Sequence, residues 1–374
     1  MLIAVNTRLL IRDKLEGIGW FAFESLKRIA RQHQEHEFLF IFDRPYSEEF
    51  VFSDNIRPVV AGPKTRHAFI WKYWFGRVVP GLLQKHNVDL FLSPDGFLPL
   101  RSSVPAVSVI HDLNFEHYPQ DVPFFARHFY LRNFPRYART ARRIATVSEY
   151  SKNDIVKCYG VEPDKIDVVY NGANESFAPL DTAEQERVRG KYAGGKPYFI
   201  YVGSMHPRKN LGRLLQAFDA FKKTSSSPMQ LMIVGEKMWW ARGLKEAYES
   251  MQHRDAVIFT GRMNPDELRA VYASAFALTY VPYFEGFGIP LTEAMYSGIP
   301  IITSSVTSMP EVAGDAALLA DPFSVNSIAD AMLKLASDAA LREALIARGK
   351  LRKQLFTWQR TADRLWDCIE KSLP

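Results

Sequence analysis

The sequence has little of what several common protein classes require. Only two of its 374 residues are cysteine, Cys158 and Cys368, which argues against a disulfide framework or a cysteine metal site and fits a reducing compartment. No apolar run approaches the roughly 20 residues that cross a bilayer. The first ten residues, MLIAVNTRLL, lack the basic region and cleavage site of a signal peptide. We therefore expect a cytoplasmic protein.

The sequence also lacks a Gly-x-Gly-x-x-Gly fingerprint, which disfavours a dehydrogenase that binds a nicotinamide or a flavin. Its composition is that of a globular protein, with 47% hydrophobic and 24% charged residues and a formal net charge of +6. A basic balance suits an anionic ligand such as a nucleotide, a nucleic acid or a membrane surface. Charge alone does not choose among them.

Short apolar runs alternate with amphipathic segments along the chain, which is the pattern of a parallel sheet covered by helices. The expected strands are 2–5, 38–42, 88–92, 106–110, 143–147 and 165–170, then 198–203, 231–235, 256–261, 275–281 and 299–303. The expected helices are 18–32 and 151–159, then 210–223, 265–274, 290–297, 324–336 and 338–350. A polar, turn-rich segment, 171–197, separates the two series. We predict two doubly wound α/β domains, 1–177 and 178–356, that face a central cleft.

Ligands of doubly wound sheets bind beyond the carboxyl ends of the strands, so the residues at those points are the candidates for a site. In the first half, Gly17, Ile18 and Gly19 open a helix after the first strand. They could let a phosphate approach the backbone, or they could form an ordinary tight turn. His111 follows the run 106–110 and could position a hydroxyl, or it could be a structural histidine bonded to a nearby carbonyl.

In the second half, Arg208 and Lys209 follow a strand and precede a helix. Two cations beside the positive end of a helix dipole suit a diphosphate, although an exposed basic turn is the plainer alternative. Gly261, Arg262 and Met263 lie at or just after the end of the expected strand 256–261. We consider their backbone as a further part of the site. It could line a flat base or a ribose.

The stretch EGFGIPLTEAM, 285–295, places Glu285 in a turn with Gly286 and Gly288. A helix is expected to start at Pro290, which would put Glu293 in its first turn. An acid in that position also complements the helix dipole. A second acid beside a glycine turn is harder to explain by capping alone.

These segments together resemble a known family. EGFGIPLTEAM is similar to the E-x7-E signature of glycosyltransferase family 4, whose members have the GT-B fold. EGIGWF, VIHDLNF, TVSEYSKNDI, VVYNG, YVGSMHPRKN, FTGRM, SGIPIITSSVTSMPEVAGDAALLADP and FTWQRTA follow the family order over nearly the whole chain. The variant with PRKN and SMPEVAGDAA most resembles bacterial mannosyltransferases of polysaccharide assembly. In the family a last helix, here 357–374, returns to complete the N-terminal domain.

The resemblance implies transfer of a sugar from a nucleotide sugar with retention of anomeric configuration. The residues it makes catalytic are Arg208 and Lys209 at the diphosphate, Glu285 at the donor-sugar hydroxyls and His111 near the sugar 6-hydroxyl. The remaining donor-binding residues are Gly17, Ile18, Gly19, Ser204, Gly261, Arg262, Met263, Gly286, Phe287, Gly288, Ile289 and Glu293. Of these, Glu293 would hold the ribose, and the N–H groups of Phe287 and Gly288 would assist Glu285. Ser204 stands where some relatives carry an arginine.

The donor implied is GDP-mannose, with a UDP-sugar and a glucosyl-, galactosyl- or N-acetylglucosaminyltransferase as the alternative. Many glycosyltransferases hold a metal with Asp-x-Asp, and the sequence contains no such pair. Cations and helix N-termini can stabilise the leaving diphosphate instead, so we expect neither a metal nor a cofactor. The acceptor would be a saccharide or a lipid-linked saccharide bound by the N-terminal domain.

Two basic and aromatic segments of that domain, 67–77 and 124–143, could touch the anionic inner face of a membrane. In 124–143 the cations at helical spacing are Arg132, Arg136, Arg139 and Arg143, and the opposite face carries Tyr130, Phe134, Tyr137 and Ala141. An amphipathic helix with a solvated charged face is the alternative. A nucleic-acid-binding protein and a non-catalytic scaffold are further alternatives, but no nucleic-acid module is recognisable and the site residues are intact.

Overall fold

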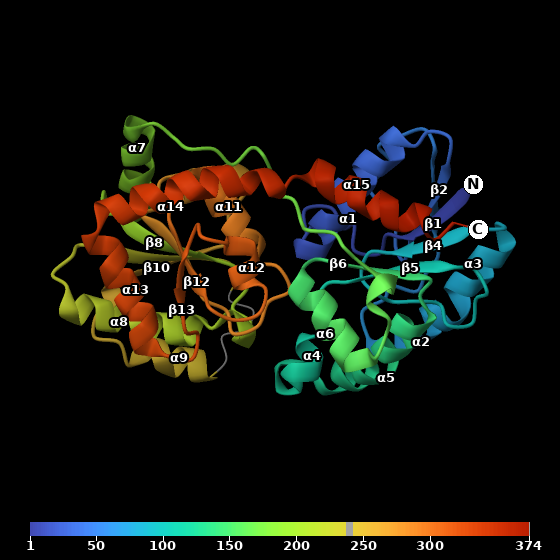
Figure 1. Ribbon diagram of the computed structural model, residues 1–374, viewed down its shortest axis with the longest axis horizontal. Helices are drawn as coiled ribbons and strands as arrows, with labels where there is room; N and C mark the ends of the chain where they lie inside the picture. Colours follow the sequence, from blue (N-terminus) through green and yellow to red (C-terminus); the bar gives the residue numbers. More distant parts are fainter. Residues whose placement is uncertain (237–241, 374) are drawn as a thin grey trace. The chain divides into compact units, whose positions relative to one another are not determined.

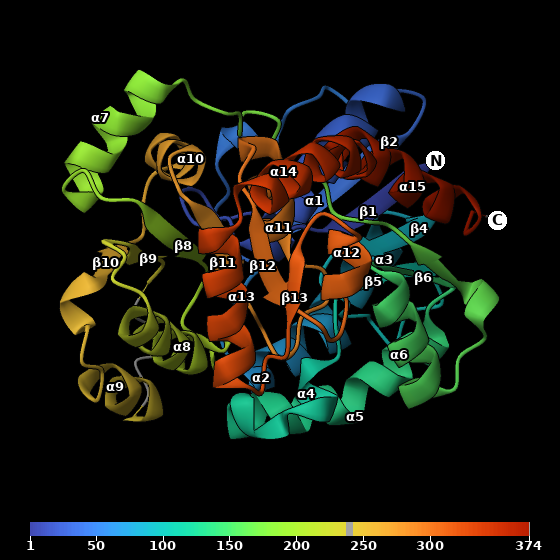
Figure 2. The same ribbon diagram turned by 60° about the vertical axis from the view of Figure 1, so that its left-hand side comes forward.

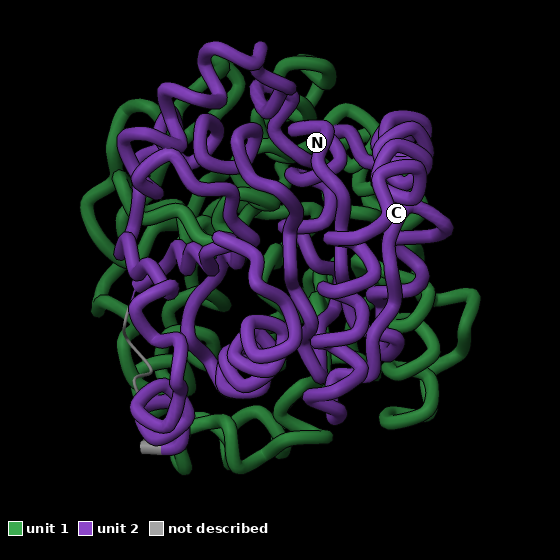
Figure 3. The backbone as a smooth tube through the Cα atoms, turned by 90° about the vertical axis from the view of Figure 1, so that its left-hand side faces the viewer, with its two compact units in different colours: residues 1–172, 358–374 green, residues 173–357 purple. Residues whose placement is uncertain are grey.

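The computed structural model describes residues 1–236 and 242–373. It divides into two compact units, which Figure 1 shows as ribbons and Figure 3 colours separately. Unit 1 is Met1–Gly172 with Trp358–Pro374, and unit 2 is Ala173–Thr357. The chain thus passes between the units after Gly172 and after Thr357, where the sequence analysis expected the passages after residues 177 and 356.

Unit 1 contains a seven-stranded sheet in the order β3-β2-β1-β4-β5-β6-β7, and every neighbouring pair is parallel. Its strands are β1 Leu2–Asn6, β2 Glu37–Phe42, β3 Ile56–Val60, β4 Leu90–Ser93, β5 Ala106–Ile110, β6 Arg143–Thr146 and β7 Ile166–Val168. The sequence analysis missed β3, since its sequence IRPVV contains a proline and is only partly buried. It lies at the sheet edge, where a proline costs no ladder hydrogen bond.

Helices cover both faces of this sheet (Figure 1). They are α1 Gly17–Gln32, α2 Ala68–Tyr73, α3 Val79–Lys85, α4 Asn114–His117, α5 Phe124–Thr140, α6 Glu149–Tyr159 and α15 Trp358–Glu370, with short turns η1 Glu48–Phe50, η2 Trp74–Val78, η3 Pro119–Asp121 and η4 Pro163–Lys165. Ile3 and Val5 face one core, which includes Phe21 and Trp366, whereas Ala4 faces the other. Burial on both faces explains why the strands read as continuous apolar runs.

Unit 2 repeats the arrangement with a six-stranded sheet in the order β10-β9-β8-β11-β12-β13, again parallel throughout. Its strands are β8 Tyr198–Val202, β9 Gln230–Val234, β10 Val257–Gly261, β11 Ala277–Tyr280, β12 Ile301–Ser304 and β13 Leu318–Ala320. The short edge strand β13 was not expected, because its three residues, of which Leu319 is exposed, are too few to form a recognisable apolar run.

The helices of unit 2 also lie on both faces of its sheet (Figures 1 and 2). They are α7 Thr182–Ala193, α8 Leu211–Thr224, α9 Arg242–Glu249, α10 Pro265–Ala273, α11 Ile289–Ser297, α12 Met309–Ala313, α13 Val325–Ser337 and α14 Ala339–Arg352, with turns η5 Pro207–Lys209, η6 Arg254–Ala256 and η7 Lys353–Leu355. Helix α8 packs with α13 and α9, and α11 packs with α10 and α14. Throughout the described chain, no helix combines the length and apolar character that crossing a bilayer requires.

Each sheet reverses its strand order once. The reversal lies between β1 and β4 in unit 1 and between β8 and β11 in unit 2. Connections leave such a pair of strands in opposite directions, which opens a crevice at their carboxyl ends, and this switch point is where ligands of doubly wound sheets bind. The segments after β8 and β11 carry Arg208, Lys209 and Glu285, so the fold itself brings the predicted diphosphate and sugar residues together.

Candidate active site

Glycines end the three consecutive strands β8, β9 and β10 at the edge of the site. Gly203 and Gly235 have φ angles of 152° and 153°, and the N–H of Gly203 donates to the Val234 carbonyl at 3.0 Å. A Cβ atom on Gly235 would lie 2.0 Å from the Gly203 oxygen. The backbones at Gly203 and Gly235 therefore lie too close together for a side chain at Gly235. This end of the sheet consequently exposes backbone and no side chain at Gly235.

The turn that carries Arg208 and Lys209 is fixed to the segment after β11. Asn210 takes a left-handed conformation with φ 63°, and its amide donates to the carbonyls of Val281 at 3.0 Å and Pro322 at 2.7 Å. The N–H of Tyr283 donates to the Arg208 carbonyl at 3.0 Å. The two cations are thus held by their own backbone before any ligand binds.

Glu285 is the centre of the side-chain cluster at the switch point. Its Oε2 atom accepts a hydrogen bond from Arg208 Nη1 at 2.8 Å and one from the Tyr280 hydroxyl at 2.9 Å. It also forms an ion pair with Lys209 Nζ, which in turn contacts the Tyr280 hydroxyl. The cluster thus brings two cations to one carboxylate, a composition that suits an anionic ligand.

The environment keeps Glu285 ionised. Burial by itself would raise the pKa of this carboxyl, but the charges of Arg208 and Lys209 and the hydrogen bonds from Lys209 and Tyr280 lower the pKa to about 2. Burial and the neighbouring Glu285 charge raise the pKa of Tyr280 well above its usual value, so its hydroxyl remains a donor. Glu285 therefore acts at neutral pH as an acceptor of hydrogen bonds and cannot donate a proton.

The glycine turn after Glu285 is held in place from α12. Ser308 Oγ donates to the Glu285 carbonyl at 2.8 Å. Gly288 caps α11 in a left-handed conformation with φ 92°, and a Cβ there would lie 2.5 Å from Met309 Cε. Gly286 is not among the glycines with positive φ, so only the second glycine is required by its conformation. The Phe287 ring is buried against Phe356, 5.5 Å between centroids.

Glu293 lies one residue deeper in its helix than expected. Helix α11 begins at Ile289, and its first turn contains no acidic residue, so the expectation of a first-turn carboxylate is wrong because the helix starts one residue earlier than Pro290. Burial raises the pKa of Glu293 to about 7, despite a hydrogen bond from the Tyr272 hydroxyl that lowers it. This carboxyl consequently changes charge near neutral pH, whereas Glu285 does not.

The other predicted donor residues of unit 2 surround the cluster more loosely. Ser204 is exposed, and its carbonyl accepts from the Tyr201 hydroxyl at 3.0 Å. Arg262 is exposed and lies 3.8 Å from a Glu236 carboxylate oxygen. Met263 is half-buried. Only their position after a strand suggested these three residues in the sequence. In the structure, none of their side chains contacts Glu285.

His111 of unit 1 is fixed at the end of β5. Its Nε2 lies 2.8 Å from the Pro94 carbonyl and must donate to it, because a carbonyl only accepts. Burial lowers the pKa of His111 despite that hydrogen bond, so the ring is neutral and its Nδ1 is an acceptor. His111 is therefore bonded to a nearby carbonyl, as the plainer alternative expected. This hydrogen bond uses Nε2 and leaves Nδ1 able to accept a hydrogen bond from a hydroxyl.

Gly17, Ile18 and Gly19 form the first turn of α1 as expected. The helix begins at Gly17 with no side-chain cap on its first N–H groups. A Cβ on Gly19 would lie 3.2 Å from both Leu15 Cδ2 and the Leu9 carbonyl oxygen. Gly19 is therefore small because the preceding loop packs against it, and this explains it without a ligand.

A different charge pair occupies the switch point of unit 1. Arg8 Nε donates to Asp95 Oδ2 at 2.5 Å, and both side chains are less than one-tenth exposed. Asn6 Nδ2 donates to the same carboxylate at 2.8 Å, and the Arg8 guanidinium lies 4.3 Å from the centre of the Phe97 ring. The residues of this network lie at or just after the ends of β1 and β4. The sequence analysis did not predict it, because a single arginine after a strand is not part of a recognisable motif.

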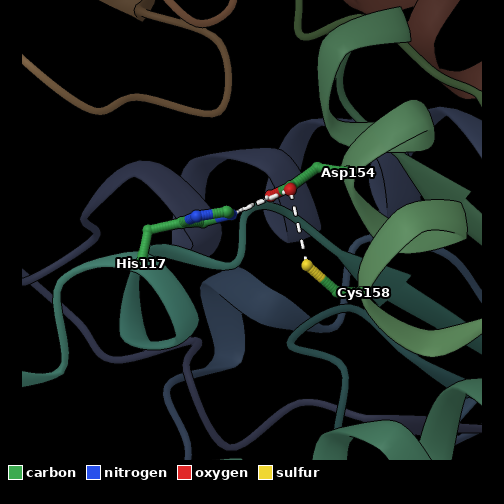
Figure 4. Close-up of side chains that lie close together, drawn as sticks. All are labelled: His117, Asp154 and Cys158. Atoms are coloured by element: carbon green, nitrogen blue, oxygen red, sulfur yellow. Dashed lines mark hydrogen bonds and ion pairs between the residues drawn. The ribbon is translucent and has the colours of Figure 1, made fainter.

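One group of three potential metal ligands lies close together in the part of the chain that the structure describes, His117, Asp154 and Cys158 (Figure 4). His117 Nε2 lies 2.8 Å from Asp154 Oδ1, and the Cys158 thiol lies 3.6 Å from the same oxygen. Burial and the Asp154 charge raise the pKa of the thiol to about 11. A protonated thiol is a poor metal ligand, so we interpret the group as a bridge between α4 and α6.

Comparison with known proteins decides the family. The model of glycosyl transferases group 1 matches residues 182–352, and that of glycosyltransferase family 4 matches residues 15–177. Together they match unit 2 and most of unit 1. The chain belongs to glycosyltransferase family 4. The predicted glycosyltransferase activity and GT-B class of fold are thereby confirmed.

Two relatives of this glycosyltransferase are named as mannosyltransferases. It is 28% identical to the O-antigen chain mannosyltransferase B of Escherichia coli, over 93% of this chain and 94% of that protein. It is 30% identical to the O-antigen chain mannosyltransferase RfbU of Salmonella typhimurium, over 68% of this chain and 66% of that protein. Among solved structures, sucrose-phosphate synthase from Thermosynechococcus elongatus superimposes with a TM-score of 0.80 at 18% identity, covering 99% and 98% of the two chains.

The expected surface helix of the glycosyltransferase needs correction. Helix α5 ends at Thr140, so Ala141 and Arg143 lie outside it. Arg143 instead begins β6 and pairs with Asp167 at 2.6 Å. The aromatic face of the helix is part of the core, where Phe134 and Tyr137 are buried. For Phe134 and Tyr137, the alternative of an ordinary amphipathic helix is therefore correct. The exposed aromatic residues of α5 are Phe124 and Phe125, at its start.

The sequence analysis missed three residues that build the site, Tyr280, Asn210 and Ser308. Tyr280 closes strand β11, where an aromatic residue is expected for packing alone. Asn210 follows two cations at a helix start, and only its left-handed backbone reveals its role. Ser308 lies within the family segment SMPEVAGDAA, so its motif was visible while its contact with the Glu285 backbone was not.

Proposed function

We propose that the protein transfers mannose from GDP-mannose, with retention of configuration, to a saccharide or lipid-linked saccharide acceptor during polysaccharide assembly. The observation that carries the proposal is the cluster at the unit 2 switch point, where Arg208 and Lys209 converge on Glu285. Both relatives described above are named as mannosyltransferases of O-antigen chains, which favours mannose over the sugars of UDP donors.

The cations would stabilise the leaving group. Breaking the bond between the sugar C1 and the phosphate oxygen leaves a nucleoside diphosphate that gains negative charge as the bond lengthens. Arg208 and Lys209 are held by the backbone contacts of their turn before the donor binds, so little reorganisation is needed when that charge develops. Preorganised donors of this kind supply about 3–4 kcal/mol of transition-state stabilisation each, and they do so without a metal.

Glu285 would hold the sugar. All three of its donors converge on Oε2, and Oε1 accepts no hydrogen bond from any residue in the described ranges. A carboxylate oxygen that stays ionised and free to accept is suited to two hydroxyls of a hexose. The N–H groups of Phe287 and Gly288, in the turn held by Ser308, would bond the sugar from the other side.

Glu293 would bind the ribose hydroxyls, and the backbone of Gly261–Met263 with Ser204 and Ile289 would line the rest of the nucleotide. From unit 1, Gly17–Gly19 would contribute N–H groups to the phosphates, and the Nδ1 atom of His111 would accept from the sugar 6-hydroxyl. Unit 1 would also bind the acceptor. Its segments 67–77 and 124–143 would give peripheral contact with a membrane.

Retention requires a route to the same face of the sugar. Glu285 is the acid that we propose to bind the sugar, and the hydrogen bonds to its Oε2 hold it in that role. We therefore assign the attack to the acceptor hydroxyl on the face that the diphosphate leaves. The acceptor oxygen forms the new bond to C1, the C1–phosphate bond breaks, and the acceptor proton passes to the departing phosphate oxygen, so no separate base is needed.

A panel of GDP- and UDP-sugars tests the proposal. We expect GDP-mannose to raise the midpoint of thermal unfolding in a chelating buffer, and UDP-sugars to have less effect. Product formed on a saccharide acceptor should carry the anomeric configuration of the donor in its proton NMR spectrum. Stabilisation by UDP-glucose alone would replace mannose by glucose, and stabilisation by no nucleotide sugar would overturn the proposed function.

A further inference from the structure

A groove of about 460 Å³ opens on the surface of unit 1. It adjoins the switch-point network, since the Phe75 ring that lines it lies 5.5 Å from the Arg8 guanidinium. It is lined by residues of α2, η2, α5 and the segment 98–101. Its cationic lining residues are Lys72, Arg77, Arg101 and Arg136. We call this the basic groove. Its volume falls in the range of roughly 300–1,000 Å³ that is usual for small-molecule sites.

The charge of the basic groove is not neutralised by the protein. Its lining contains no aspartate or glutamate, and the four cations form no ion pair with any residue in the described ranges. All four are exposed. Two other arginines of unit 1, Arg8 and Arg143, are paired with Asp95 and Asp167. Four unpaired cations around one depression favour an anion with several charges.

The local backbone departs from a regular helix at the groove. Residues 74–78 form a π-helical turn between α2 and α3, and Pro80 is the second residue of α3. A proline has no N–H for the carbonyl of Gly76 and its ring crowds that carbonyl, which accounts for the wider turn. Gly76 and Arg77 from this turn both line the groove, and π turns occur often at functional sites.

The groove has an apolar rim as well as charges. Phe69 lines it and is 74% exposed, and Phe125, from the start of α5, is 65% exposed. Their ring centroids lie 5.9 Å apart. Large aromatic side chains seldom remain this exposed in adjacent positions without a partner. The floor is formed by apolar groups such as Phe75 and Phe129.

We propose that the basic groove binds the diphosphate of a lipid-linked acceptor, with the hydrocarbon chain lying along Phe69 and Phe125. The inference rests on the proposed function, which needs an acceptor on unit 1. A free phosphate would use the cations but not the rim, and a neutral lipid would use the rim but not the cations. A single-stranded nucleic acid could stack on aromatic rings, but the floor offers few polar groups for base edges.

The test uses farnesyl diphosphate as the probe, with binding followed by calorimetry on the full chain. The variant R77E/R136E should bind the probe at least ten-fold more weakly, and F69S/F125S should lose most of the preference for farnesyl diphosphate over inorganic diphosphate. The matched control is K85E/R142E, which reverses two exposed cations of unit 1 that do not line the groove and do not lie within a helical turn of a residue that does. It should bind within two-fold of the wild type.

Three results would overturn the proposal. They are equal binding of inorganic and farnesyl diphosphate, equal weakening in the groove and control variants, and tighter binding of a single-stranded oligonucleotide than of the probe. Unfolding of a charge-reversed variant would be recognised by its thermal midpoint, and R77Q/R136Q would then replace it. Affinity for GDP-mannose should be unchanged in all groove variants, so failure of the donor site would be detected separately from failure of the groove.

Discussion

The two units share a strand order but hold different charges at their switch points. In unit 1, Arg8 and Asp95 form a closed pair of one cation and one anion, covered by the Phe97 ring. In unit 2, Glu285 meets two cations and has an oxygen with no donor among the described residues. The first arrangement pairs one cation with one anion, whereas the second brings two cations to a carboxylate that keeps one oxygen for a proposed ligand.

This difference shows that a charged cluster at a switch point is not necessarily a ligand-binding site. Both clusters lie at the position where a doubly wound sheet binds ligands. A buried pair whose members satisfy each other serves folding, because removing one member leaves the other charged and desolvated. We propose that the unit 2 cluster serves binding, because a ligand would complete it. Five predictions separate the two roles.

The largest effect is expected on stability in unit 1. Asp95→Asn leaves the buried Arg8 without a counter-charge and should lower the free energy of unfolding by about 3–5 kcal/mol, measured by urea denaturation. GDP-mannose affinity should not change. Glu37→Gln, which removes the exposed partner of Arg57, is the control and should cost at most about 1 kcal/mol. A loss of donor binding in Asp95→Asn would place unit 1 charges in the donor site.

The next effect is on turnover in unit 2. Lys209→Ala removes one of the two preorganised cations and should lower kcat by about two orders of magnitude or more, with a smaller change in stability than Asp95→Asn produces. Lys223→Ala on the surface of α8 serves as the control. Steady-state kinetics that showed kcat unchanged and only KM raised would assign Lys209 to ground-state binding instead.

The two glutamates of unit 2 should differ in how pH affects stability. The pKa of Glu293 is raised from 4.5 to about 7, so the folded protein binds its proton more tightly, and stability falls as pH rises from 4.5 through 7. Glu293→Gln should therefore equal the wild type at pH 4 and exceed it by about 3 kcal/mol at pH 8. Denaturation at both pH values checks this, and equal stability at pH 8 would contradict it.

Glu285 should show the opposite dependence, because its pKa is lowered to about 2. Its contribution to stability is present above pH 4.5 and is lost as pH falls toward 2. Glu285→Gln should thus be less stable than the wild type at neutral pH and should approach it in acid. It should also lose turnover strongly, because a neutral amide holds the sugar hydroxyls and the two cations less well.

The smallest effect is expected from the support of the glycine turn. Ser308→Ala removes the hydrogen bond to the Glu285 carbonyl and should cost about 1 kcal/mol, seen as a several-fold loss of turnover. Ser305, which is exposed at the end of β12, offers a matched serine-to-alanine control. If both variants retain full turnover, the turn is fixed by Gly288 and its neighbours without Ser308.

Much of the fold followed from the sequence. The runs 106–110 and 38–42 match β5 and β2 closely, because strands buried on both faces must be apolar throughout. The edge strands β3 and β13 escaped prediction for the converse reason, since an edge needs less burial. The end of α5 was misplaced because Arg143 continues the helical spacing in sequence while its side chain pairs with Asp167 beyond the helix.

The site was predictable in its motifs but not in its contacts. Arg208, Lys209 and Glu285 stand after strands that the sequence reveals, and the strand order brings those ends together. Their mutual ion pairs, the part played by Tyr280 and the deeper position of Glu293 depend on side-chain geometry that spacing does not encode. The roles assigned to His111 and Gly17–Gly19 rest on the family resemblance and remain predictions.

The most direct test of the central claim compares GDP with GMP. The two differ by the phosphate that Arg208 and Lys209 are proposed to bind, so calorimetric titrations in a chelating buffer isolate that contact. We predict that the wild type binds GDP at least ten-fold more tightly than GMP and that this ratio falls toward one in Arg208→Ala/Lys209→Ala, while GMP affinity is kept. An unchanged ratio in the double variant would contradict the account.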